Sequence, residues 1–210
     1  MTNSAIYDFR RDGAWNSSFS FHYECAWHCF YEYKESISNL HTEETFLRDS
    51  TDIEDEYLEG YIHHKTDHIH AQAYRAATSA HLYACMAIEG FINHYGTIRL
   101  GEDVFKSLLE RTGITEKLSL IYLLCFEKVT LISDHPIKSI RKIFDQRNTL
   151  VHPKTKELTP QNLSKYIYLH PSKLEIETTM THLEDFISDI CNMDKNISRD
   201  FSFKKPEKPN

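Results

Sequence analysis

Apolar residues recur at intervals of three and four along most of the chain, which is the spacing of one face of an α-helix. Strand-like alternation is weak by comparison. The pattern predicts helices over residues 19–47, 53–98, 102–111, 116–127, 136–152 and 172–193. We therefore expect an all-α protein, arranged as an up-and-down helical bundle with extra helices at its N-terminus.

The most regular apolar stripe lies within residues 53–98, which we interpret as one long helix or two collinear helices. Its small members indicate that a neighbouring helix approaches closely. The stripe consists of Ala73, Ala77, Ala80, Ala84, Ile88, Phe91, Ile92 and Tyr95. The last predicted helix carries a similar stripe, formed by Leu174, Ile176, Met180, Leu183, Phe186, Ile187 and Ile190.

Turn and capping residues suggest where several helices begin and end. Gly113 suits a position just after helix 102–111, and Thr115 suits the N-cap of helix 116–127. Pro136 fits a first helical turn, and Pro153 should end the same helix at His152. The first fifteen residues are expected to be irregular, and residues 194–210 to form a disordered tail.

Composition limits the fold class, the cellular compartment and the kinds of partner. Glycine and proline number six each, too few for an all-β protein built on tight turns. The formal net charge of −7 provides no general basic field for nucleic acid. Five cysteines without a CxxC pair are typical of free thiols in a reducing compartment. With neither a signal peptide nor a membrane-length apolar run, we expect a cytoplasmic protein with no membrane partner.

One charged residue interrupts an apolar helical face. Ile140, Phe144 and Val151 project within roughly 40° of one another, and Arg147 falls inside that arc. Arginine is rarely buried without a partner, so either a carboxylate meets it in the interior or this face opens onto an anion site. The adjacent face carries Asn148 together with His152, four residues later.

These three side chains suit RNA cleavage without a metal. A guanidinium can hold phosphate oxygens in bidentate fashion, and an imidazole can transfer protons near neutral pH. The ribose 2′-hydroxyl would attack the adjacent phosphate while Arg147 stabilises the developing charge. The expected products carry a 2′,3′-cyclic phosphate and a 5′-hydroxyl. The predicted catalytic residues are Arg147, Asn148 and His152, with no cofactor and no metal.

The segment Arg147-Asn148-Thr149-Leu150-Val151-His152 resembles the RxxxxH signature of the HEPN superfamily. Residues 84–93 are similar to the alanine-rich second helix of many such domains, and residues 114–118 to the start of the helix that follows. The resemblance covers roughly residues 70–193, whereas residues 1–69 resemble nothing known to us. It implies a HEPN-like bundle over 70–193, and we expect 1–69 to form a helical extension packed on that core.

The resemblance also implies a homodimer in which two RxxxxH helices face each other across a composite cleft. Many members are ribonucleases, often toxins or anti-phage factors, so RNA is the expected substrate and an antitoxin protein a possible partner; DNA is not expected. Other members are inactive, which leaves open a silent module that binds RNA, nucleotide or a partner protein. We further predict that Glu89 pairs with Arg147 and that Asn93 lines the same cleft.

A third hypothesis is a histidine-rich metal-binding helical protein. His22, Cys25 and Cys29 share one helical face next to His28, and such soft ligands can hold zinc. The second histidine group contains His63, His64, His68 and His70. For both groups a core helix or a solvated helix face is the simpler interpretation.

Overall fold

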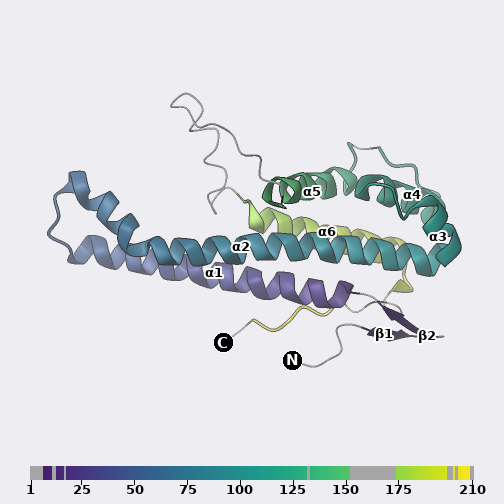
Figure 1. Ribbon diagram of the computed structural model, residues 1–210, viewed down its shortest axis with the longest axis horizontal. Helices are drawn as coiled ribbons and strands as arrows, with labels where there is room; N and C mark the ends of the chain where they lie inside the picture. The colour runs from purple at the N-terminus through teal and green to yellow at the C-terminus, as the bar shows by residue number, and fades with distance from the viewer. Residues whose placement is uncertain are drawn as a thin grey trace.

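Six α-helices and one short β-hairpin make up the part of the chain that the computed structural model describes, namely residues 7–10, 13–16, 18–131, 133–151, 174–197, 201 and 203–208 (Figure 1). The predominantly helical architecture expected from the apolar pattern is confirmed. The hairpin replaces the irregular start that was predicted: β1 (Tyr7–Arg10) pairs antiparallel with β2 (Gly13–Asn16).

A long helical hairpin forms the base of the molecule. Helix α1 (Phe19–Ser50) and helix α2 (Asp55–Leu100) lie side by side along most of their length (Figure 1). Helix α1 runs unbroken, and α2 is one helix that bends close to its N-terminal end. The boundary predicted between residues 69 and 70 therefore falls inside the continuous helix α2.

The shorter helices pack against the C-terminal half of α2. They are α3 (Glu102–Leu108), α4 (Ile114–Phe126), α5 (Ile137–Val151) and α6 (Ile176–Met193), and Figure 1 shows α5 and α6 on the side of α2 opposite α1. Helix α2 is consequently the centre of the core. Its fully buried side chains include Ala77, Ala80, Ala84, Ala87 and Ile88. The small size of the four alanines lets neighbouring helices approach closely. None of the helices described here has the combined length and apolarity that crossing a membrane requires.

A buried histidine holds three of these helices together. The ring of His81 on α2 lies 3.0 Å from Thr179 Oγ1 on α6 and 3.0 Å from the carbonyl oxygen of Ile143 on α5. Because a carbonyl only accepts, Nε2 carries the proton and donates to Ile143, and in the neutral ring Nδ1 accepts from the Thr179 hydroxyl. Both polar ring atoms are thus satisfied, and α5 is held one turn before Arg147.

The predicted disordered tail is wrong for the residues that the structure describes beyond 200. Phe201 is only 2% exposed, and its ring centroid lies 4.7 Å from that of Phe91 on α2. Further along, Lys205 Nζ lies 4.2 Å from the centre of the Trp27 ring on α1. Burial of the Phe201 ring and its aromatic contacts oppose the entropy cost of ordering this extended segment, which returns along α1 (Figure 1).

Two capping predictions also require correction. Gly113 is the N-cap of α4, with φ of −65°, rather than a left-handed residue closing α3. Thr115 lies inside the first turn of α4 instead of capping it. The turn after α3 closes without a left-handed glycine because the N–H of Leu109 donates to Phe105 and that of Thr112 donates to Leu109. Helix α5 begins directly after Pro136, close to the predicted start.

Candidate functional site

The end of α5 borders a groove of about 380 Å³ that three separate parts of the chain form. Helix α5 contributes Arg147 and Asn148, α2 contributes Glu89, and the turn entering α4 supplies the opposite wall. The complete lining is Glu89, Thr112, Gly113, Ile114, Thr115, Glu116, Arg141, Phe144, Asp145, Arg147 and Asn148. We call this feature the Arg147 groove. It brings together three of the five residues predicted for the site.

The predicted ion pair between Glu89 and Arg147 is not formed among the described residues. The half-buried Arg147 instead donates from Nη1 to Oδ1 of Asn148, at 3.0 Å. Glu89 is exposed on α2, so water solvates its carboxylate and it does not need the guanidinium. The two charges still share the groove, since both act on the pKa of Cys85 beneath them.

Cys85 itself is unsuited to nucleophilic chemistry. Burial raises the pKa of its thiol to about 12; the Arg147 charge opposes that rise and the Glu89 charge adds to it. The thiol is therefore protonated at neutral pH, and its Sγ points at the carbonyl oxygen of Ile143, 4.0 Å away. Cys85 belongs to the packing beneath the groove.

The groove carries charges of both signs. Arg141 Nε lies 3.9 Å from Asp145 Oδ2, one helical turn away on α5. Glu116 accepts a hydrogen bond from Thr115 Oγ1 at 3.0 Å and folds back over Gly113. Arg147, whose partner in the described residues is a neutral amide, is the cation best placed to receive an anion from solvent.

His152 lies outside the described residues. It follows Val151, the last residue of α5 that the structure describes, so the groove can be built from the structure only as far as Arg147 and Asn148.

Asn93 acts away from the Arg147 groove. Its Oδ1 accepts a hydrogen bond from Lys117 Nζ at 3.0 Å, and Lys117 is only 6% exposed. The bond ties α4 to α2 and satisfies a buried cation. Lys117 was missed although it shows the same signal as Arg147, a charged residue next to Leu118 on an apolar helical face.

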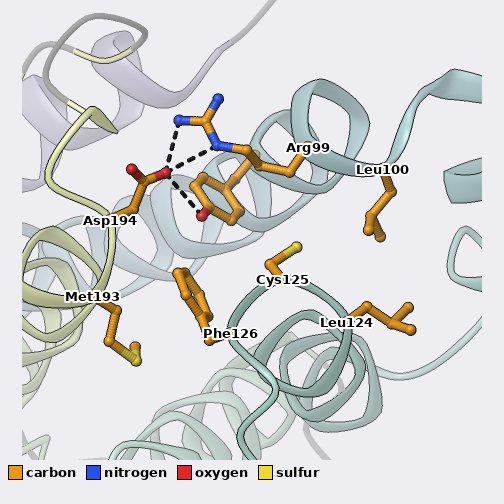
Figure 2. A pocket seen from close by; sticks show the side chains of 8 residues that line it. Arg99, Leu100, Leu124, Cys125, Phe126, Met193 and Asp194 are labelled. Atoms are coloured by element: carbon orange, nitrogen blue, oxygen red, sulfur yellow. Dashed lines mark hydrogen bonds and ion pairs between the residues drawn. The ribbon is translucent and has the colours of Figure 1, made fainter.

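A second pocket, of about 360 Å³, lies between the end of α2 and the ends of α4 and α6 (Figure 2). Arg99 Nε donates to Asp194 Oδ2 at 2.9 Å, Nη2 lies 2.7 Å from the same oxygen, and Tyr95 Oη donates to it at 3.0 Å. The guanidinium also covers the Tyr95 ring, 5.1 Å from its centre. Leu124, Phe126 and Met193 give the pocket an apolar wall.

The charges in this second pocket are held by one another. Burial alone would raise the pKa of Asp194, but hydrogen bonds from Arg99, from the backbone N–H of Asn196 and from Tyr95 outweigh it, so the pKa is lowered. Burial and the neighbouring Asp194 raise the pKa of Tyr95. We conclude that Asp194 is ionised and Tyr95 neutral at pH 7, as a structural ion pair requires.

Neither histidine group considered from the sequence assembles a set of three metal ligands in the described residues. His22 stacks on Tyr83 with ring centroids 6.0 Å apart, and His70 lies 3.8 Å from Glu44. The described residues do contain one group of three: the potential ligand atoms of His135, His182 and Asp185 all lie within 4.8 Å of one another. Sequence offers no signal for it, because His135 is far from the other two along the chain.

Comparison with known proteins found no matching family model, no matching curated protein and no matching solved structure.

Proposed function

We propose that this protein is a metal-independent endoribonuclease with a HEPN-like bundle, and that the Arg147 groove is part of its active site. The observation that supports this most directly is the pairing of Arg147 with Asn148 on the wall of an open groove. An arginine held by a neutral neighbour keeps its positive charge for a phosphate, and its planar donors match phosphate oxygens.

Each residue then has a defined task. Asn148 orients the guanidinium through their 3.0 Å hydrogen bond. Arg147 binds the scissile phosphate and stabilises the negative charge that grows on it. His152, one residue beyond the described part of α5, takes the proton from the ribose 2′-hydroxyl. The 2′-oxygen bonds to phosphorus as the bond to the 5′-oxygen breaks, and the products are a 2′,3′-cyclic phosphate and a 5′-hydroxyl.

A second copy of the chain completes this chemistry. Two protons move in the reaction, one from the 2′-hydroxyl and one to the leaving 5′-oxygen, so an acid is needed as well as a base. A homodimer with two α5 helices facing each other supplies a second imidazole and a second guanidinium. It also doubles the local positive charge in a chain whose net charge is −7.

One observation favours a second candidate, a catalytically silent module that binds a partner protein. Three carboxylates, those of Glu89, Glu116 and Asp145, line the groove beside two arginines. This surplus of negative charge opposes RNA, whereas a partner with basic and amide groups would suit it. An antitoxin-like protein of that kind would cover the groove.

The test is cleavage of single-stranded RNA by the purified full chain in EDTA. We expect cyclic-phosphate and 5′-hydroxyl ends, and a rate lowered at least about 100-fold in His152→Ala. His64→Ala, which removes an exposed histidine from α2, is the matched control and should retain the wild-type rate. Cleavage that survives both His152→Ala and Arg147→Ala would rule out this active site. Absence of both RNA binding and cleavage would favour the silent module that binds a partner protein.

A further inference from the structure

His135, His182 and Asp185 form a cluster at the other end of α5. His182 and Asp185 are three residues apart on α6, so their side chains share one helical face. His135 reaches them from the turn just before α5, with its Nε2 3.9 Å from Asp185 Oδ2. The ring centroids of the two histidines are 6.3 Å apart.

The chemistry and spacing of this group match a transition-metal site. Two imidazoles and one carboxylate are a set that zinc accepts, with a water molecule in the fourth position. Two ligand atoms each about 2.1 Å from a tetrahedral zinc stand about 3.4 Å apart. The present separations, all within 4.8 Å, are therefore close to those of a bound state. Side-chain rotation of the exposed His135 and Asp185 can close the difference.

Hydrogen bonding within the protein leaves part of this cluster unsatisfied. Nδ1 of His182 is buried and has no hydrogen-bond partner among the described residues. Buried polar atoms normally have one, so the ring is better explained if a further group completes it. A metal bound to the cluster, or a water that the metal orders, provides that group.

We propose that His135, His182 and Asp185 bind one zinc ion, which fastens the start of α5 to α6. Nearby, Lys142 Nζ on α5 donates to Glu175 Oε2 at 2.6 Å, so the ion adds a second and stronger link between the same two segments. The site is separate from the proposed ribonuclease chemistry. Arg147 stands ten residues after the start of α5, about 15 Å along the helix axis.

Equilibrium dialysis of the full chain against Zn²⁺ tests the proposal. We expect one zinc per chain, a melting temperature raised by about 5 °C when zinc saturates the site, and no binding of Mg²⁺, which prefers all-oxygen ligands. His182→Ala and Asp185→Asn should each weaken zinc binding at least about tenfold. His135→Ala should do the same, and because His135 is exposed this variant should disturb folding least.

The control is His64→Ala, since His64 and His68 form an exposed pair one turn apart on α2 that could collect zinc by itself. This variant should bind zinc as the wild type does. No zinc binding by the wild type would overturn the proposal. The proposal would also be overturned if His182→Ala and His135→Ala bound zinc as tightly as the wild type, or if His64→Ala lost zinc binding. These measurements do not involve RNA, so their outcome is independent of the ribonuclease assay.

Discussion

Two arginines near the ends of α5 and α2 border pockets of similar volume, yet they are held in opposite ways. Arg99 makes an ion pair and a hydrogen bond with Asp194 and covers the Tyr95 ring (Figure 2). Arg147 donates to the amide of Asn148, its neighbour in sequence. In the pocket beside Arg99, the positive charge is neutralised by Asp194. In the Arg147 groove, the positive charge remains available to a ligand.

The difference shows why a charged residue on an apolar face does not by itself indicate a site. Arg99 and the buried Lys117 each meet an acceptor from a distant segment, Asp194 in one case and Asn93 in the other. Their charges secure the packing of α2 against α4 and α6. Arg147 has no such acceptor among the described residues, although Glu89 lies on the same groove. The structural role of Arg99 and Lys117 is evident only from these partners, which the fold provides.

Exchanging each arginine for alanine tests this comparison with the largest expected effect. Arg147→Ala should lower RNA cleavage by about 100-fold or more and leave the free energy of unfolding within about 0.5 kcal/mol of wild type. Arg99→Ala should do the reverse. Cleavage below the melting temperature stays unchanged, while the free energy of unfolding falls by about 1–3 kcal/mol because Asp194 loses its partner.

Urea unfolding and a cleavage time course measure both quantities on the same preparations. Arg147→Lys sharpens the result, because lysine keeps the charge but cannot bind phosphate in bidentate fashion. Its cleavage rate should therefore lie between those of wild type and Arg147→Ala. The exposed Arg75 on α2 gives the control Arg75→Ala, which should change neither quantity. The comparison fails if folded Arg99→Ala also loses cleavage.

The second prediction concerns the support of the helix that carries Arg147. His81→Gln should lower the free energy of unfolding at pH 7.5 by about 1–3 kcal/mol, since Thr179 and Ile143 lose well-placed partners. Burial lowers the pKa of His81, and its hydrogen bond to Ile143 opposes this only in part. In the unfolded chain His81 takes up a proton at about pH 6.5, whereas in the folded chain it stays neutral at that pH.

Stability owed to the neutral His81 ring is therefore complete above about pH 6.5 and decreases as the pH falls below that value. Between pH 7.5 and 5.5, urea unfolding should show a larger decrease in the free energy of unfolding for wild type than for His81→Gln. For His64→Gln, which replaces an exposed histidine, the decrease should equal that of wild type. Equal losses in wild type and His81→Gln would mean that His81 is not held neutral.

The smallest expected effect comes from the acidic wall of the Arg147 groove. Glu89→Gln removes a negative charge near the proposed phosphate position, so single-stranded RNA should bind about two- to fivefold more tightly at low salt. The gain should disappear at high salt. Fluorescence anisotropy measures RNA binding, and Glu56→Gln is the control because Glu56 is an exposed carboxylate near the start of α2. Weaker binding in Glu89→Gln would show that this carboxylate helps to hold the ligand.

Much of the helical framework follows from local spacing. The stripe from Ala73 to Tyr95 predicted a helix with small buried residues, and α2 has both. The ends were less predictable. Gly113 carries signals for a C′ residue and for an N-cap alike, and the turn hydrogen bonds of Leu109 and Thr112 decided between them. The burial of Phe201 could not be foreseen, because the surface that receives it is formed by Phe91 and Phe19 on separate helices.

The candidate site divides in the same way. Helical periodicity alone placed Arg147 and Asn148 on neighbouring faces of one helix, because side-chain direction within a helix depends only on residue number. Contacts between helices depend instead on how α2, α4, α5 and α6 pack. That packing left Glu89 and Arg147 unpaired within one groove, placed Asn93 within hydrogen-bond distance of Lys117, and brought His135 close to His182 and Asp185. The sequence by itself determined the helices and the faces they present; the tertiary structure decided which charges are neutralised and which remain available.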